Sequence, residues 1–337
     1  MGLATGYTLG TQTLKACTAD GLHCSTASIA LPGSQNILVI GPDGEIYSYD
    51  SVTKKVWKFK PDGTADGFVQ LGIVNGIAVD DLTNYLLATQ NDGNAPLLVI
   101  SGTSIIESPG AGDLAVAVDA KNGVSCVPRI LTNKLGCLDL TALNPSNQVF
   151  NSSSTFGLQP WAIWETTING KPTALVSTRD GSPTLWEFNV TGGNPILTTS
   201  LSLPGVTPLS SLHGGVGGWQ LTGFTTGPAA GMAAYLSTVD NQLLVVNATS
   251  MTYVGNPITF PGFPWWIAAD ETNGKMIVAT IDTVHQTTTF ASVDPASQLV
   301  TPIAGTAPFV ATGVKISPDG KNIIAAQGQT LAFIPNN

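Results

Sequence analysis

Short runs of alternating apolar and polar residues, separated by polar or glycine-containing turns, occupy almost the whole chain. In the segment 73–89, IVNGIAVDDLTNYLLAT, Ile77 and Val79 fall on one face, a polar turn follows, and a second apolar run begins at Tyr85. Alternation with a period of two is typical of a half-buried β-strand. The segment therefore predicts strand, turn and strand, with Asn75 just before the first run.

A four-strand phrase of this kind recurs along the chain. The first strands of seven phrases start near residues 26, 75, 113, 160, 214, 265 and 312, so the spacing is 38 to 54 residues. Four short strands every 40–50 residues, roughly, are the period of a β-propeller blade. The last phrase has only three strands, whereas residues 6–16 form an extra strand before the first. We therefore expect an all-β, seven-bladed β-propeller of antiparallel four-stranded blades. We expect a single domain, residues 1–337, whose ring is closed when the N-terminal strand pairs beside residues 329–334.

Composition and charge agree with this fold and exclude several function classes. Hydrophobic residues make up 43% and charged residues 10% of the chain, with 37 Gly and 22 Pro, which suits many short strands and tight turns. The net charge is −9 and no cluster of Lys and Arg exceeds an adjacent pair, so we expect no nucleic-acid partner. No apolar run approaches the roughly 18 residues of a membrane helix, so we expect no membrane span.

The four cysteines form two local pairs. Cys17 and Cys24 bracket a short loop, and Cys126 and Cys137 are equidistant from a turn at residues 131–132, which places them opposite each other in a hairpin. Opposed residues have Cβ atoms about 4.5–5.5 Å apart, close to what a disulfide requires. Two disulfides and no odd thiol favour an oxidising compartment, although four reduced buried thiols remain an alternative. Neither pair has the spacing of a metal site.

The start of the chain and its sequons bear on the compartment. MGLATGYTLG has neither a charged nor an apolar signal region, so we expect a cytosolic protein or a secreted one whose signal peptide has been removed, with Met-Gly as a cloning remnant. Three N-glycosylation sequons, at Asn151, Asn189 and Asn247, permit a secreted glycoprotein but occur about as often as chance allows. The disulfides favour the secretory route.

The repeats resemble those of NHL, YVTN and gluconolactonase-like propellers. NGIAVDD, SPDGKNIIAA and GPDGEIYSYD match the inner-strand and turn phrases of those families, and the resemblance covers nearly all of the chain. It implies that the first strand of each blade lines a central channel, and that the residues just before it rim the mouth where ligands bind. The rim positions are Ser28, Asn75, Asp113, Gln159 with Trp161, His213, Trp265 with Trp266, and Thr312.

A metal site at this rim would be incomplete. Gluconolactonase-like enzymes hold one metal ion with a Glu, two Asn and an Asp, and the resemblance matches only Asn75 and Asp113 to that set. No Glu stands before STASIALPG and no second Asn precedes WAIWE. We therefore predict that the protein uses no metal ion or other cofactor. Asn75 and Asp113 could instead cap turns or bind backbone groups.

The remaining candidates are one histidine and several aromatic residues. His213 has Ser210 and Ser211 beside it, but no nucleophile elbow is present, so His213 is a candidate hydrogen-bond donor or acid–base group rather than part of a triad. A purely structural role remains open. His23 and His285 are predicted to lie in loops. Four tryptophans on or beside inner strands, and one after the glycine run, could either fill the core or form an apolar cup: Trp161, Trp164, Trp265, Trp266 and Trp219.

Low charge, abundant Ser, Thr and Gly, local disulfides and an incomplete metal set together resemble the propellers of fungal natural-product clusters. Members of that group act as cofactor-free cyclases, including hetero-Diels–Alderases that join a quinone methide to a terpene such as humulene. The resemblance implies a hydrophobic small-molecule substrate, held by Trp161, Trp265, Trp266 and their rim neighbours. Asn75, His213 and Thr312 are our candidate catalytic donors. A metal-dependent lactone hydrolase and a secreted binding module are the alternatives.

Overall fold

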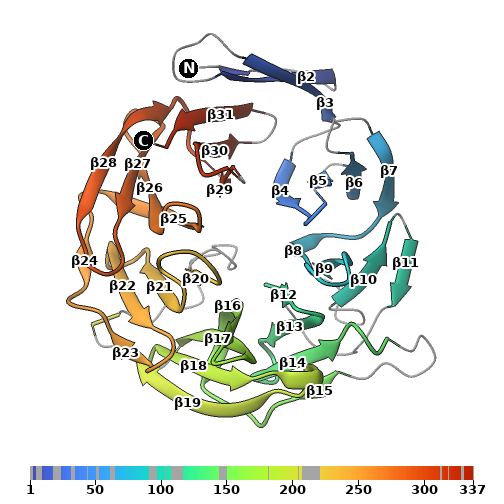
Figure 1. Cartoon of the computed structure of the whole chain (residues 1–337), viewed down its shortest axis with the longest axis vertical. Coiled ribbons are helices and arrows are strands. Elements are labelled where there is room, and N and C mark those ends of the chain that lie inside the picture. Colours follow the sequence, from blue (N-terminus) through green and yellow to red (C-terminus); the bar gives the residue numbers. More distant parts are fainter. Residues whose placement is uncertain are drawn as a thin grey trace.

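The computed structural model describes most of the chain as a ring of β-sheets (Figure 1). The residues described are 3–4, 10–17, 24–31, 35–43, 45–50, 53–60, 65–90, 97–102, 104–107, 117–143, 150–180, 182–203, 205–206, 221–311, 313–317, 319–327 and 330–336. Within them, seven antiparallel sheets follow one another around the ring, and we call them blades 1 to 7 in chain order. This confirms the predicted seven-bladed β-propeller.

The first three blades come from the N-terminal half of the chain. Blade 1 contains β4 (Gln35–Ile40), β5 (Ile46–Asp50), β6 (Lys55–Phe59) and β7 (Ala65–Gln70). Blade 2 contains β8 (Val74–Val79), β9 (Leu86–Gln90), β10 (Leu97–Ser101) and β11 (Ser104–Glu107). Blade 3 contains β12 (Asp119–Lys121), β13 (Val124–Arg129), β14 (Lys134–Asp139) and β15 (Asn151–Ser152).

The next three blades continue the ring. Blade 4 contains β16 (Leu158–Ile168), β17 (Lys171–Asp180), β18 (Thr184–Asn189) and β19 (Ile196–Ser202). Blade 5 contains β20 (Leu221–Gly223), β21 (Met232–Ser237), β22 (Gln242–Asn247) and β23 (Thr252–Tyr253), and β24 (Ile258–Thr259) also pairs with β22. Blade 6 contains β25 (Phe263–Asp270), β26 (Lys275–Asp282), β27 (Thr287–Val293) and β28 (Val300–Ala307).

Blade 7 joins the two ends of the chain. Its strands β29 (Gly313–Ile316), β30 (Asn322–Gln327) and β31 (Thr330–Pro335) are completed by β1 (Leu3–Ala4), which pairs with β31. The strand predicted for this position, residues 6–16, is elsewhere: β2 (Gly10–Cys17) pairs with β3 (Cys24–Leu31) in a separate hairpin. The expected start of blade 1 near residue 26 is wrong for the same reason, because that segment is β3.

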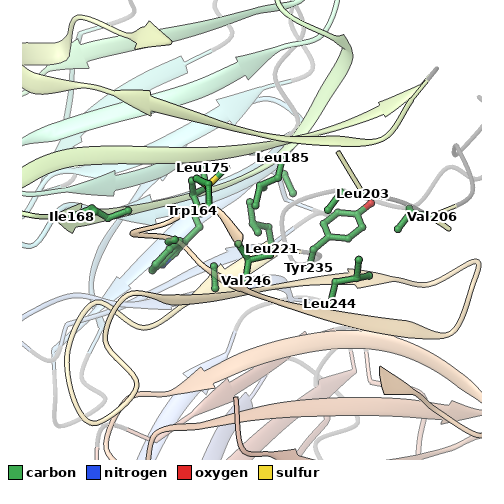
Figure 2. Close-up of a cluster of buried hydrophobic side chains, with 14 residues drawn as sticks. Trp164, Ile168, Leu175, Leu185, Leu203, Val206, Leu221, Tyr235, Leu244 and Val246 are labelled. Carbon is green, nitrogen blue, oxygen red and sulfur yellow. The ribbon is translucent and has the colours of Figure 1, made fainter. Parts of the chain in front are cut away.

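The core lies between neighbouring blades. Side chains alternate along each strand, so one face of a blade packs on the preceding blade and the other face on the next. Figure 2 shows the cluster between blades 4 and 5, where Trp164 and Leu175 meet Leu221 and Tyr235. A Cβ on Gly223 would lie 2.4 Å from the Trp164 ring, so this position of β20 requires glycine.

Cross-strand geometry confirms one predicted disulfide. Cys126 and Cys137 are directly opposite in the β13–β14 register and are bonded. Cys17 and Cys24 are opposite in the β2–β3 register, but their side chains lie outside the described residues, so that disulfide stays a prediction. Nowhere in the described ranges is there a helix long and apolar enough to cross a membrane.

Candidate functional site

The inner strands carry a repeated irregularity close to their first residues. In β8, Val74 is opposite Gln90 and Gly76 is opposite Thr89, so Asn75 is an extra residue, a β-bulge. The inner strands β4, β8, β12, β16, β20, β25 and β29 surround the centre of the ring (Figure 1). We call the side of the ring on which these strands begin the leading face. Equivalent bulges occur on three more blades: at Asn36 in β4, at Trp161 and Ala162 in β16, and at Trp265 in β25.

These bulges explain why Asn75 precedes an apolar run. A bulge inserts one residue into the strand register, and bulges of this kind re-aim side chains beside functional sites. They also correct the predicted rim. Ser28 lies in β3, outside the blades, and Asn36 occupies the blade 1 position that we had assigned to it. Sequence reasoning missed Asn36 although QNILVIGPDG matches NGIAVDDLTN once the phrase is aligned on its asparagine.

Blade 6 presents two aromatic rings at the leading face. Phe263 and Trp265 stack with ring centroids 5.3 Å apart and an interplanar angle of 27°. Phe263 is 37% exposed, and Trp265 is half-buried against the core between blades 6 and 7. Gly262, just before the pair, has a φ of 120°, which an L side chain rarely adopts. The stacked pair is a partly exposed apolar surface.

The other predicted aromatic residues differ in their surroundings. Trp266 is buried in the core between blades 6 and 7 and its indole N–H donates to the Ala311 carbonyl at 3.1 Å, so it holds two blades together rather than lining a surface. Trp161 is half-buried and packs on the core between blades 4 and 5. Trp164 is fully part of that core.

The position of Gln159 is set by its backbone conformation and by a hydrogen bond to its backbone N–H. It has a φ of 50°, in the left-handed region, and its N–H donates to the Asn133 side-chain oxygen at 2.9 Å. Three predicted rim residues, Asp113, His213 and Thr312, lie outside the described residues, as does Trp219. Their roles stay predictions.

A histidine–aspartate pair stands on the turn between β26 and β27. His285 Nδ1 is 2.6 Å from Asp282 Oδ2, and both side chains are exposed, in keeping with the predicted loop position. Hydrogen bonds from the backbone and ring of His285 hold the pKa of Asp282 below its usual value. The same carboxylate accepts the backbone N–H of Val284, so the pair closes its own turn.

A second group of ionisable residues lies deeper in the ring. Glu165 of β16 is buried; neither carboxyl oxygen has a hydrogen bond of good geometry among the described residues, although the backbone N–H groups of Cys126 and Lys121 are close enough to lower its pKa. Burial, and then the charge of Asp119 on β12, raise the pKa of Glu165 well above its usual value. Burial also raises the pKa of Asp119 to about 6, although its oxygens accept the backbone N–H groups of Glu165 and Ala120 at 2.9 Å.

These deeper residues were missed by the sequence reasoning. A charge inside an otherwise apolar inner strand, as in WAIWE and GVKI, was the available signal. No group of three or more His, Cys, Asp or Glu side chains in the described part of the chain is arranged to hold a metal ion.

Comparison with solved structures agrees with the class of protein that the fold defines, a seven-bladed β-propeller. The chain is similar to a Kuenenia stuttgartiensis hydrazine synthase structure, with a TM-score of 0.65 and 13% identity over 90% of this chain and 96% of that one. It is also similar to dihydro-heme d1 dehydrogenase NirN, with a TM-score of 0.66 and 13% identity over 99% of this chain and 73% of that one. A chain of the mitotic checkpoint complex is also similar, with a TM-score of 0.64 and 12% identity over 89% of this chain and 86% of that one.

These likenesses show the fold alone, because the identities are far below the level at which function is shared. No protein-family model and no curated protein matches the sequence.

Proposed function

We propose that the chain is a propeller enzyme that binds hydrophobic small molecules at its leading face and catalyses a cofactor-independent cyclisation of the hetero-Diels–Alder type. The observation that carries the proposal is the stacked, partly exposed Phe263–Trp265 pair at the start of the bulged inner strand β25. Two apolar reactants held against such a surface would lose their translational freedom before reaction, which is a large part of the barrier to a bimolecular cycloaddition.

The polar residues of the leading face supply the second part of the mechanism. Asn75 is the extra residue of the bulge in β8, and its amide is suited to donate to a carbonyl oxygen on which negative charge develops. His213 and Thr312 are the other candidate donors. Trp161 and Gln159 in blade 4, with Asp113, would complete the binding surface around the reactants. The reaction requires no redox step, since bonds form between two unsaturated partners without loss of atoms.

A metal-dependent lactone hydrolase is the second candidate, favoured by one observation. Asn36 and Asn75 occupy the same bulge position on neighbouring blades, and Asp113 precedes the inner strand of the next blade in the sequence. Two amides and a carboxylate are oxygen ligands of the type that Ca²⁺ takes. These residues would hold the ion, and the ion would polarise the lactone carbonyl.

The proposed compartment is the secretory route. The Cys126–Cys137 disulfide supports it, because disulfides persist mainly in oxidising compartments. The sequon at Asn151 is on β15, where the side chain is exposed and accessible to a glycan. Purification from a eukaryotic secretion host, followed by mass measurement before and after glycosidase treatment, tests both points.

The decisive assay follows cyclisation of humulene with a quinone methide generated in solution, by chiral chromatography of the adduct. Trp265→Ala should lower the catalysed rate by about tenfold or more through a looser reactant pose. Asn75→Ala should cost about 10²–10³ if its amide stabilises the transition state. The matched control is Trp57→Ala, because Trp57 also contacts an exposed ring, that of Phe68, in a tilted arrangement on the outer strands β6 and β7.

Chelation separates the candidates. Turnover that survives EDTA supports the cyclase. Lactone hydrolysis that disappears with EDTA and returns with Ca²⁺ would replace it with the hydrolase. Binding of humulene without acceleration of either reaction would indicate a binding module, and equal effects of the Trp57 and Trp265 variants would show that the leading face is the wrong surface.

A further inference from the structure

One outer strand of the ring lacks the features that keep strand edges from pairing. β19 is the outermost strand of blade 4, at the rim of the ring (Figure 1), and each of its residues except Leu201 is exposed. Among the described residues its hydrogen-bonded partner is β18, on one side only. An outer strand of this kind presents backbone N–H and C=O groups that can pair with another chain.

The outer strands of the other blades are short or carry a blocking residue. β1, β15 and β23 have two residues each, and β11 has four and ends at Glu107. β7 carries the exposed carboxylate of Asp66, and β28 contains Pro302, which has no N–H to donate. Short length, charge and proline are the usual protections of a strand edge. β19 has seven residues, ILTTSLS, none of them charged and none of them proline.

The absence of charge extends well beyond β19. No Asp, Glu, Lys or Arg occurs from residue 188 to residue 239, although charged residues make up 10% of the chain. Thr191 and Asn194, at the turn before β19, are also exposed, so the strand lies within a neutral surface strip.

This strip favours one kind of partner. The whole chain has a net charge of −9, so like charge opposes most contacts between two copies. A neutral strip lets two acidic copies meet without that repulsion, whereas a basic partner would be attracted to the acidic remainder of the surface. The charge distribution therefore favours a second copy of this chain.

Neighbouring contacts hold β19 in its extended form. It pairs with β18 from Ile196 to Ser202. Leu201 packs against the core between blades 4 and 5, and the hydroxyl of Tyr253 in blade 5 donates to the backbone carbonyl of Ser202. Because the strand is already ordered, little conformational freedom is lost when a partner strand is added.

We propose that two copies of the chain associate by antiparallel pairing of their β19 edges, so that the two blade 4 sheets become one continuous sheet across a two-fold axis near Ser200. Each copy contributes the same residues to such an interface, and Thr199 of one copy lies opposite Leu201 of the other. Only neutral side chains meet, and the Ser and Thr hydroxyls are suited to hydrogen bonds across the strands. One strand pair is a small interface, so we expect a Kd in about the micromolar range.

The pairing leaves the leading face open. Phe263 and Trp265 belong to the inner strand of blade 6, whereas β19 is at the outer rim of blade 4 (Figure 1). The association therefore does not depend on the proposed function, and each can fail without the other.

Sedimentation equilibrium of the whole chain tests the proposal. The protein is produced without glycans, because the sequon residue Asn189 is opposite Ile196 and a glycan there would cover the edge. Between about 1 and 100 μM the mass should rise from one copy to two and no further, because two-fold pairing uses the edge of both copies. A single copy throughout, or growth beyond two copies, would overturn the proposal.

Two lysine variants locate the contact. Ser200→Lys places like charges beside the two-fold axis and should raise the Kd of the dimer by at least about tenfold. Thr301→Lys, at an exposed position of the outer strand β28, is the matched control and should leave the Kd unchanged. A dimer of equal stability in the two variants would refute β19 as the contact.

Hydrogen exchange of the unmodified protein decides the matter even if Ser200→Lys does not fold. Backbone amides in residues 196–202 should exchange more slowly at about 100 μM than at about 1 μM, because pairing protects the free edge. Amides of β28 should exchange at the same rate at both concentrations. Unchanged exchange in residues 196–202 would rule out pairing at this edge.

Discussion

Replacing Glu165 with glutamine should stabilise the protein at neutral pH. The folded state keeps this carboxyl buried beside Asp119, and burial, followed by the charge of Asp119, raises its pKa well above the usual value. In the unfolded chain the same group ionises above a pH of about 4.3. Above that pH the unfolded state binds fewer protons than the folded one, so the free energy of unfolding falls as the pH rises.

The size of the effect follows from this difference in bound protons. The folded state binds one proton more than the unfolded state between the unfolded and the folded pKa of Glu165. Across that range the free energy of unfolding falls by about 1.4 kcal/mol for each pH unit. Glutamine has the same shape and does not titrate, so Glu165→Gln removes this slope. The variant should equal the original protein near pH 4, within about 1 kcal/mol, and gain about 1.4 kcal/mol with each further pH unit until Glu165 ionises.

Urea unfolding at pH 4.5, 5.5, 6.5 and 7.5, read by tryptophan fluorescence, measures the difference between the two proteins. Glu271→Gln is the control of opposite sign. Burial alone would raise the pKa of Glu271, but hydrogen bonds from Thr225 and Thr226 outweigh it and lower the pKa. That variant should lose stability at neutral pH, and the loss should vanish as the pH falls through the folded pKa of Glu271. A Glu165→Gln protein less stable than the original at pH 7.5 would mean that the buried carboxylate is charged and paired.

Further predictions concern the disulfides and the strand pairing that closes the ring. Replacing Cys126 and Cys137 with serine should lower the free energy of unfolding by about 2–4 kcal/mol. Mapping of unreduced peptides should show the Cys17–Cys24 linkage as well as Cys126–Cys137. Four alkylatable thiols in the native protein would contradict this. Deleting residues 1–5 removes β1, the outer strand of blade 7, and leaves the edge of β31 without its partner strand. Thermal unfolding should then broaden, and the exposed strand edge should favour aggregation. An unchanged melting curve would show that β1 does not close the ring.

Local patterns in the sequence were sufficient for the architecture. Period-two alternation and turn residues act over a few positions, so the seven phrases and the opposed Cys126 and Cys137 could be predicted without knowing the ring. The same patterns could not place the first blade. STASIALPG alternates like an inner strand, and only its pairing with residues 10–17 shows that it belongs to a separate hairpin.

The site depended on tertiary structure for a related reason. Alternation predicts that Trp265 and Trp266 point to opposite sides, but the bulge at Trp265 shifts the register, so the sequence could not tell which of the two is buried between blades 6 and 7. Asp119 and Glu165 are 46 residues apart in the sequence, and the backbone N–H of Glu165 reaches the Asp119 carboxylate only because β12 and β16 are inner strands of neighbouring blades. The sequence determined the number and period of the strands. The register of each inner strand and the closure of the ring decided which side chains meet at the centre of the ring and at its leading face. Register and closure depend on contacts between segments that are distant in the sequence, so local patterns do not determine them.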